Sequence, residues 1–477
     1  MRRVTHDRSW PLHDVAASRA IEQSCAAQLA PHALMQRAGL AVARLALAVA
    51  PHANHVWVAC GPGNNGGDGF EAAMHLAAWG KQVTVTYAGD EAKAPPDARA
   101  SLGRARAAGV HFTDGPPADF SLAIDALLGI GAARPLEGRM REWADAMNAS
   151  AAAVVAIDVP SGLAADTGTG DAVRASHTLC LLTLKPGLFT AQGRDASGDV
   201  WFDDLGVGEI AASPVALLSG APARAVRAHD SHKGRWGDVA VIGGAPGMAG
   251  AALLAASGAL HGGAGRVFVG LLGDTIAVDP SQPELMLRAW DSLDLASMTV
   301  ACGCGGGDEV RMALPKVLSS SRSLVLDADA LNAIAVDTKL QTQLRSRAAR
   351  GKPTVLTPHP LEAARLLGVA VQQVQSDRIA AARTLAERCD CVVVLKGSGT
   401  LVAAPHRAPH INPTGNARLA TAGTGDVLAG LLAARLGFAH DAFDAACSAA
   451  FDHGLVADRW PHGHALTASA LAGALAA

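Results

Sequence analysis

The sequence predicts an α/β protein of two domains, each a mostly parallel sheet covered by helices on both faces. Short apolar runs alternate with segments of helical spacing through both halves of the 477 residues. The alternation lapses between about residues 206 and 230, where Ala, Pro, Ser and Gly dominate, and then begins again. Several apolar runs end in glycine-rich or acidic loops, which is where open α/β sheets bind ligands.

The expected elements follow this alternation in chain order. In the N-terminal half we expect strands at 55–60, 83–87, 122–127, 154–158 and 179–184, with helices at 70–79 and 136–147. In the C-terminal half we expect strands at 238–243, 266–271, 323–327, 354–357 and 392–396, and helices from Gly425 onward. The domains are therefore placed at residues 1–215 and 225–477.

The composition excludes several classes of protein. Hydrophobic residues make up 50% and charged residues 17%, as in a globular protein. Forty Lys and Arg nearly balance 43 Asp and Glu, so no nucleic-acid partner is expected. The eight cysteines lack the spacing of a structural zinc site and are interpreted as reduced thiols. With no signal peptide and no apolar stretch of membrane-spanning length, we expect no membrane partner and a cytoplasmic location.

The first candidate site is the loop GPGNNGGDG at residues 61–69, between an expected strand and an expected helix. Its amides could bind an anion at the positive end of the helix, and it matches the GxGxxG dinucleotide pattern, with Asp90 as ribose partner. Its two Asn and one Asp supply oxygen ligands of the kind that hard cations prefer. A turn that only tightens the connection remains the alternative.

Two carboxylates and a cation end other strands of this half. Asp125 and Asp158 lie at two strand ends, and Lys185 follows a third, so all three are expected at one edge of the sheet. Either carboxylate could instead only cap a helix or a turn.

These residues resemble the YjeF N-terminal family, the NAD(P)HX epimerases. The resemblance rests on LMQRAG at 34–39, GNNGGDG at 63–69, Asp125, DVPSG at 158–162 and LKPG at 184–187. It implies that potassium is held by Asn65, Asp125 and Ser161. It implies that the hydrated nucleotide is held by a larger set: Asn64, Asn65, Gly66, Gly67, Asp68, Gly129, Ile130, Gly131, Ala132, Ala133, Arg134, Pro135 and Asp158.

The second candidate site is the sequence TAGTGDVLAG at 421–430, where small residues start a helix and Asp426 lies in its first turn. Amides at such a helix start can stabilise a transferring phosphoryl group, and Asp426 could take the proton of an attacking hydroxyl. An acidic residue that only favours the helix dipole is the alternative. The chain has no Walker signature, so a P-loop enzyme is excluded.

Four further polar clusters flank strands of this half, and we expect them to share one site with Asp426. They are His232–Gly234, Asp327–Asn332, Thr357–Glu362 and Lys396–Thr400.

The C-terminal set resembles the ribokinase-like superfamily and, more narrowly, the ADP-dependent NAD(P)HX dehydratases. The narrower match rests on HKG at 232–234, PELM at 283–286, the His359 segment and NPTGN at 412–416. The chain departs from the pattern at Cys304 and Gly306, at Leu361, and at Arg418 with Leu419. The resemblance implies that Ala251, Gly305, His359 and Asp426 contact the hydrated nucleotide. It implies that the adenine nucleotide is contacted by Lys396, Gly397, Ser398, Gly399, Thr400 and Gly425.

Together the resemblances imply a Rossmann-like three-layer αβα domain followed by a ribokinase-like αβα domain. The expected protein is a bifunctional enzyme, an isomerase and a lyase. It would interconvert the R and S forms of hydrated NADH and NADPH and dehydrate the S form with ADP and Mg²⁺, giving AMP and phosphate. Asp426, Asp125 and Lys185 are the expected catalytic residues, and the chain is expected to form a homo-oligomer.

Two other functions stay open at this point. A kinase for a small molecule or vitamin precursor, fused to a dinucleotide-binding domain, would leave a stable phosphorylated product. A nucleotide sensor without turnover would keep its binding when Asp426 is removed.

Overall fold

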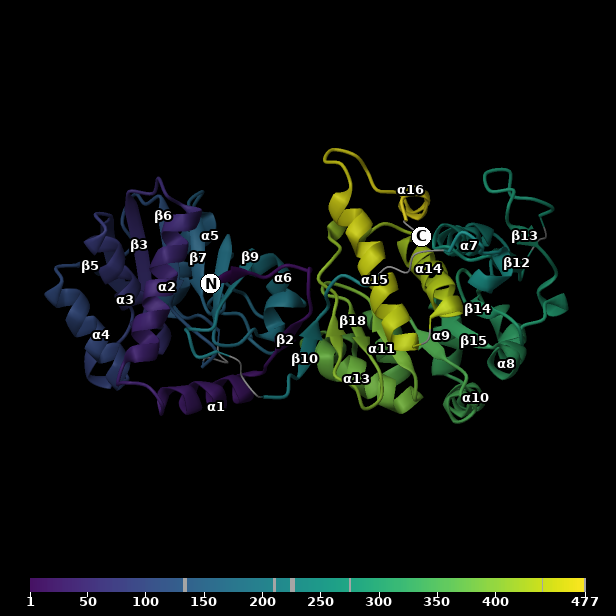
Figure 1. Cartoon of the computed structure of the whole chain (residues 1–477), viewed down its shortest axis with the longest axis horizontal. Helices are drawn as coiled ribbons and strands as arrows, with labels where there is room; N and C mark the ends of the chain where they lie inside the picture. Colours follow the sequence, from purple (N-terminus) through teal and green to yellow (C-terminus); the bar gives the residue numbers. More distant parts are fainter. Residues whose placement is uncertain (132–134, 209–211, 224–227, 274–275, 440, 476–477) are drawn as a thin grey trace. The chain divides into compact units, whose positions relative to one another are not determined.

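The computed structural model describes residues 1–131, 135–208, 212–223, 228–273, 276–439 and 441–475. Backbone contacts divide the chain into two compact units, Met1–His6 with Trp10–Leu218 and Asp7–Ser9 with Ser219–Ala477 (Figure 1). Within the described ranges, no helix has the length and apolar character needed to cross a membrane.

The first unit is built on a sheet in the order β1-β9-β8-β7-β6-β3-β4-β5, in which only β1 is antiparallel to its neighbour. The strands are β1 (Arg2–Arg3), β3 (His55–Cys60), β4 (Gln82–Tyr87), β5 (His111–Thr113), β6 (Leu122–Ala126), β7 (Ala153–Ile157), β8 (His177–Leu181) and β9 (Asp199–Asp203). Two short strands, β2 (Trp10–Leu12) and β10 (Ala216–Leu218), pair with each other antiparallel.

Successive residues of a strand point to opposite faces of the sheet, and in these strands the residues on both faces are apolar. Helices therefore cover both faces. Val56 and Val58 of β3 pack against α2 (Ala33–Val49), α3 (Asn64–Ala78) and α4 (Pro96–Ala107). Trp57 and Ala59 point the other way and pack against α5 (Gly138–Ala149). Helices α1 (Val15–Ala26) and α6 (Gly193–Ala196) and the 3-10 turns η1 (Glu91–Lys93) and η2 (Pro186–Phe189) complete the unit.

The strand order reverses between β3 and β6. The chain runs from β3 outward to β5, returns to β6 on the other side of β3, and continues outward to β9. The loops after β3 and β6 therefore leave the sheet in different directions, which opens the edge where ligands bind in such sheets. Gly61 allows their close approach, since a Cβ there would lie 1.7 Å from the carbonyl oxygen of Leu127.

The sheet of the second unit has the order β13-β12-β11-β14-β15-β16-β17-β18-β19. It is parallel from β13 to β17 and antiparallel beyond. The strands are β11 (Asp238–Gly243), β12 (Arg266–Leu271), β13 (Met286–Leu287), β14 (Thr299–Cys302), β15 (Ser323–Leu326), β16 (Thr354–Leu356), β17 (Val392–Leu395), β18 (Leu401–Ala403) and β19 (His410–Ile411).

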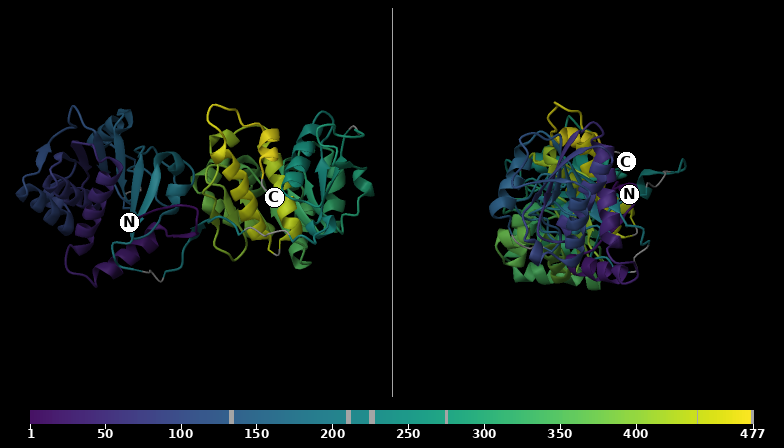
Figure 2. Two further views of the ribbon diagram at one scale, coloured as in Figure 1. Left: turned by 45° about the horizontal axis from the view of Figure 1, so that its top comes forward. Right: turned by 90° about the vertical axis from the view of Figure 1, so that its left-hand side faces the viewer.

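Two helical layers enclose this sheet. One contains α7 (Ala249–His261), α14 (Thr424–Phe438), α15 (Ala442–Arg459) and α16 (Ala468–Gly473), and α14 and α15 run side by side in Figures 1 and 2. The other contains α8 (Val310–Ser320), α9 (Ala328–Ala335), α10 (Thr338–Ala349), α11 (Pro360–Leu367) and α13 (Arg378–Cys389), with α12 (Val371–Ser376) beside them. Three further 3-10 turns are η3 (Lys233–Trp236), η4 (Trp290–Ser292) and η5 (Ala417–Leu419).

Polar side chains fix several helix starts in both units. The side chain of Asp14 accepts a hydrogen bond of 2.7 Å from the amide of Ala17 at the start of α1. Asp441 accepts one of 2.9 Å from the amide of Asp444 at the start of α15. Such caps satisfy amides that the helix itself leaves unpaired.

The predicted α/β class with two αβα units is confirmed, and every expected strand is present. The strand Thr299–Cys302 was not predicted, although it lies inside the sheet between β11 and β15. Residues 64–69 were expected as loop but form the first turns of α3. The His232–Gly234 cluster precedes β11, so it lies at the amino edge of the parallel strands, and its predicted place beside Asp426 is wrong.

Candidate active sites

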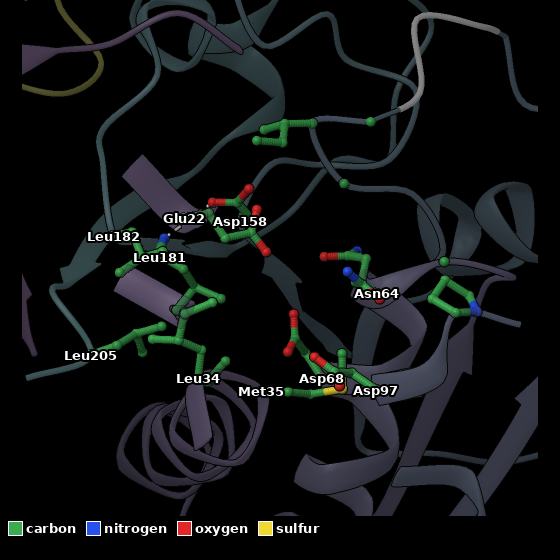
Figure 3. A pocket seen from close by; sticks show the side chains of 18 of the residues that line it. Glu22, Leu34, Met35, Asn64, Asp68, Asp97, Asp158, Leu181, Leu182 and Leu205 are labelled. Atoms are coloured by element: carbon green, nitrogen blue, oxygen red, sulfur yellow. Dashed lines mark hydrogen bonds between the residues drawn. The ribbon is translucent and has the colours of Figure 1, made fainter. Parts of the chain in front are cut away.

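The first unit contains a cavity of about 870 Å³, which we call the N-terminal cavity (Figure 3). Eight of the predicted site residues line it: Asn64, Asn65, Asp68, Gly129, Ile130, Gly131, Asp158 and Lys185. They come from the start of α3 and from the loops after β6, β7 and β8, which all leave the same edge of the sheet. Of these residues, the strand ends predicted Asp158 and Lys185, the glycine-rich loop predicted Asn64, Asn65 and Asp68, and the resemblance implied the others.

Other predicted residues of this unit are not in its lining. Gly66 and Gly67 are buried in α3, where added Cβ atoms would lie 2.1 Å from the Gly61 carbonyl oxygen and 2.6 Å from Met35. These two glycines thus permit close packing of the helix start. Pro135 does not line the cavity, and Ala132, Ala133 and Arg134 lie outside the described residues.

Asn65 is buried at the start of α3, and no described residue forms a hydrogen bond with its side-chain Nδ2. Its amide approaches the next loop, because a Cβ on Gly129 would lie 3.2 Å from Asn65 Oδ1. A buried amide without a partner is costly, and a ligand that supplies one would stabilise it.

Asp125 is fully buried at the end of β6 and is absent from the cavity lining. Its carboxylate accepts hydrogen bonds from the Ser161 amide (2.8 Å), the Ser161 hydroxyl (2.5 Å) and the Leu127 amide (3.3 Å). Burial raises the pKa of Asp125 to about 6, against the opposing effect of these hydrogen bonds. Asp125 and Ser161 are thus brought together as predicted, below the cavity surface.

Lys185 pairs with Asp158 and, in the described part of the chain, forms no hydrogen bond or ion pair with Asp125. The Lys185 ammonium forms a short ion pair with Asp158 Oδ1 and donates to the Leu181 carbonyl oxygen at 2.9 Å. Burial lowers the pKa of Lys185, but the charge of Asp158, the neighbouring Cys180 and the hydrogen bonds to both together raise it. Asp158 has a left-handed backbone (φ 67°), which aims its carboxylate into this pair.

Sequence reasoning missed Glu22, a half-buried residue of α1 that also lines the cavity. Burial and the charge of Asp158 raise the pKa of its carboxyl. Burial and the charge of Glu22 raise the pKa of Asp68 well above its usual range. Figure 3 shows Glu22 and Asp158 at the same cavity as Asp68 and Asp97. No motif marked Glu22, because its helix precedes the first strand of the α/β alternation.

The second unit gathers its polar residues at the carboxyl edge of its parallel strands. We call Cys304, Asp327, Lys396 and Asp426 the C-terminal cluster. The Cys304 sulfur and carboxylate oxygens of Asp327 and Asp426 lie within 4.8 Å of one another. Lys396 Nζ lies 2.6 Å from Asp327 Oδ1 and would lie 3.4 Å from a Cβ on Gly425. Three of these four residues follow β14, β15 and β17, as parallel strands require.

Asp426 lies in the first turn of α14, which begins after Gly423 in a left-handed conformation (φ 89°). Burial and the charge of Asp327 raise its pKa to about 6, while a hydrogen bond with the Cys304 thiol lowers it. His453 donates from Nε2 to the Thr424 carbonyl oxygen at 2.8 Å, and burial lowers its pKa to about 4, so it supports this turn as a neutral ring.

The segment Lys396–Thr400 turns sharply after β17. Gly397 has φ 129°, and a Cβ there would lie 3.0 Å from the guanidinium of Arg378. Buried Arg378 donates to the carbonyl oxygens of Leu395 (3.4 Å) and Lys396 (3.1 Å) and so holds the turn. Arg378 was not predicted, because it lies on α13, far from any motif.

Two further predicted residues lie beside this edge. Ala251 of α7 contacts the turn at Gly305, where φ is 57° and an added Cβ would lie 2.8 Å from the Ala251 methyl. Cys304 immediately precedes Gly305, so this contact adjoins the C-terminal cluster.

His359 has a clear structural role as the N-cap of α11. Its Nδ1 accepts from the amides of Leu361 (3.1 Å) and Glu362 (3.3 Å), and its Nε2 lies 3.2 Å from Glu362 Oε1. Burial and the nearby charge of Lys396 lower the pKa of His359, and burial raises that of Glu362 to about 7.

Comparison with known proteins gives the same division of the chain. The sequence model for the YjeF-related protein N-terminus matches residues 31–187, and that for NAD(P)H-hydrate dehydratase matches residues 239–476. A solved ADP/ATP-dependent NAD(P)H-hydrate dehydratase from Bacillus subtilis is 31% identical, with a TM-score of 0.45, over 52% of this chain and 90% of that one.

Three curated relatives are similar over long stretches. The bifunctional NAD(P)H-hydrate repair enzyme of Escherichia coli K12 is 37% identical over 89% of this chain and 84% of its own. The bifunctional NAD(P)H-hydrate repair enzyme of Coxiella burnetii is 35% identical over 90% of this chain and 91% of its own. The ADP-dependent (S)-NAD(P)H-hydrate dehydratase of Neisseria meningitidis serogroup B is 45% identical over 52% of this chain and 86% of its own. The chain belongs to the family of bifunctional NAD(P)H-hydrate repair enzymes.

Proposed function

We propose that this chain repairs hydrated NADH and NADPH in two steps. The N-terminal unit interconverts the R and S epimers, and the C-terminal unit dehydrates the S form with ADP, releasing AMP and phosphate. The observation that carries the proposal is that one chain holds both family halves, each with its polar residues at the carboxyl edge of its own sheet. The names of the relatives support both activities.

In the C-terminal unit, the proposed reaction is phosphoryl transfer followed by elimination. Asp426 takes the proton of the substrate hydroxyl as its oxygen attacks the β-phosphorus of ADP, and AMP leaves. The lone pair of the ring nitrogen then expels phosphate, and loss of a proton from the adjacent carbon restores the dihydropyridine. Lys396 would offset the negative charge that gathers around Asp327 and the phosphates. Ala251, Gly305 and His359 would contact the hydrated nucleotide, and Gly397–Thr400 with Gly425 the adenine nucleotide.

Magnesium would enter with ADP, neutralising its phosphates. The test is to incubate the full chain with hydrated NADH, ADP and Mg²⁺ and to follow the absorbance of the reduced ring. We expect recovery of NADH with one AMP and one phosphate released for each NADH. A stable phosphorylated nucleotide would instead support a small-molecule kinase, and binding without any product would support a sensor.

In the N-terminal unit, the hydrated nicotinamide ring would enter the N-terminal cavity beside Asn64, Asp68 and Asp158. The ion pair with Lys185 would hold the Asp158 carboxylate in place. The loop at Gly129–Gly131 and the start of α3 would hold the rest of the nucleotide, with Ala132–Pro135 continuing that loop in the chain.

We also propose that Asn65, Asp125 and Ser161 hold potassium. The unpartnered buried amide of Asn65 and the adjacent carboxylate and hydroxyl of the other two supply neutral and singly charged oxygens, which suit a weakly hydrated cation. Such an ion would balance the charge of Asp125 and hold the loops after β3, β6 and β7 together. Anomalous diffraction from crystals grown in a rubidium salt tests this, and a peak anywhere but beside Asn65 and Asp125 would contradict it.

Self-association and a cytoplasmic location stay predictions. Light scattering of the purified chain measures the first, with a homo-oligomer as the expected result, and cell fractionation measures the second.

A further inference from the structure

The N-terminal cavity needs a proton donor that reaches the substrate. Epimerisation at the hydroxyl-bearing carbon requires that the C–O bond break, and hydroxide is a poor leaving group unless it receives a proton. Asp125, the acid suggested by the sequence, is fully buried, is absent from the cavity lining, and has its carboxylate oxygens bonded to Ser161 and Leu127.

Glu22 meets the requirements that Asp125 does not. Its helix α1 forms part of the cavity wall, and its carboxyl is half-buried beside the same space as Asp158 (Figure 3). Lys185 lines this space too. The groups whose charges act on it are Asp158, Lys185, Arg19 and Asp97, and Glu22 in turn acts on Asp68. Carboxylates on several sides and burial together keep the proton on Glu22 to higher pH than in water.

We propose that Glu22 is the catalytic acid and base of the epimerase. This inference rests on the proposed function of the N-terminal unit. It assigns a role to a residue that lies in the N-terminal helix, before the region matched by the family's sequence model.

Epimerisation begins with loss of the hydroxyl from the ring carbon and ends with its return on the other face. The C–O bond breaks with its electron pair moving to oxygen, the Glu22 carboxyl gives its proton to that oxygen, and water leaves. The ring nitrogen lone pair forms a C=N bond, so the ring carries a positive charge that nearby Asp158 stabilises. Water then adds to the other face of the carbon and passes a proton, through a second water molecule, to the Glu22 carboxylate, and the C=N electrons return to nitrogen. Glu22 is then protonated as at the start, and the reverse reaction follows the same steps.

The test is Glu22→Gln in the full chain, which keeps the size and polarity of the side chain but cannot exchange the proton. Chromatography of the R and S epimers of hydrated NADH, without ADP, gives the epimerisation rate. We expect kcat to fall by about 10² to 10⁴-fold with KM changed far less. ADP-dependent dehydration of purified S epimer by the same protein should be unchanged, and an unchanged calorimetric transition of the first unit shows that the variant is folded.

Glu142→Gln is the matched control, because Glu142 is exposed on α5 in the same unit and undergoes the same chemical change. Glu22→Asp, which keeps a carboxyl, should retain more activity than Glu22→Gln. In the wild type, kcat/KM for epimerisation should fall as pH rises through the raised pKa of Glu22, and this fall should be absent in Glu22→Gln.

Each other outcome has a distinct meaning. If the wild type does not epimerise, the proposed function of the unit fails. The assignment of Glu22 as the acid is overturned if the wild type is active and Glu22→Gln keeps more than half of its kcat. It is also overturned if the substitution changes only KM. A wild-type rate that does not fall at high pH would overturn it even if Glu22→Gln does not fold.

Discussion

At the scale of residues, both sites contain carboxyl groups that exchange protons near neutral pH. Burial at a sheet edge raises the pKa values of Asp125 and Asp426 to about 6 and that of Glu362 to about 7. The charge of Lys396 limits this effect, because it lowers the pKa values of Glu362 and Asp426. The ionisation of each acid therefore depends on which cation the fold places beside it.

Replacing Asp426 by Asn should remove the proposed base of phosphoryl transfer. We expect ADP-dependent recovery of NADH to fall by about 10² to 10⁴-fold, while epimerisation in the other unit continues. Absorbance of the reduced ring measures the first activity and chromatography of the epimers the second. Asp390→Asn is the control, since Asp390 is exposed and its left-handed backbone (φ 50°) suits Asn. Turnover above half of the wild-type value would remove Asp426 from the mechanism.

The Cys304 thiol should influence the pH dependence of the same reaction. Its hydrogen bond lowers the pKa of Asp426, so its loss raises that pKa. The base must be ionised, and kcat/KM therefore falls as pH drops through about 6 in the wild type. In Cys304→Ala the fall should begin at higher pH, by roughly half a unit for a weak donor.

Two variants separate this effect from packing. Cys304→Ser keeps a donor and should restore the wild-type profile. Cys302→Ala removes an equally buried thiol on β14. Cys304, not Cys302, is the thiol bonded to Asp426, so this variant should leave the profile unchanged. Equal shifts in Cys302→Ala and Cys304→Ala would mean that the thiol does not act through Asp426.

At the scale of elements, the glycine-rich segment after β3 acts by packing as much as by binding. Helix α3 begins at Asn64, and Gly61 lies against the carbonyl oxygen of Leu127. Gly61→Ala would force the ends of β3 and β6 apart, and we expect a loss of roughly 3 kcal/mol or more in the stability of the first unit. Calorimetry of the full chain measures the change in that unit's transition.

Gly103→Ala is the same substitution at a position where we expect stability to rise. Gly103 lies inside α4, and a Cβ there would meet no atom within 4 Å. Alanine should stabilise the helix by about 0.5 to 1 kcal/mol. If both substitutions changed stability equally, close packing at Gly61 would not be the cause.

At the scale of the whole molecule, the structure suggests where the chain can be divided. The first unit extends to Leu218, because β10 (Ala216–Leu218) pairs with β2 (Trp10–Leu12). A fragment of residues 1–218 should fold and interconvert the epimers. A fragment of residues 1–215, the predicted domain, lacks β10 and should melt at a lower temperature. Equal melting temperatures would mean that the β2–β10 pair contributes nothing to the first unit.

The sequence by itself determined the fold class, the strand ends and the residues that follow them, because buried parallel strands leave continuous apolar runs and their carboxyl ends meet at one edge. Asp158, Asp327 and Lys396 could be located in this way, and Asp426 from the small residues that start its helix. The strand Thr299–Cys302 could not, since four residues before a glycine run give too short a periodic signal.

Only the tertiary structure decided which of these groups touch. It paired Lys185 with Asp158, placed Asp125 beneath the cavity, and brought Glu22 of α1 to the cavity and Arg378 of α13 to the turn after β17. Such contacts join residues distant in the chain, and they depend on how helices pack across a sheet, which local periodicity does not encode. The burial that raises the pKa values at both sites comes from the same packing.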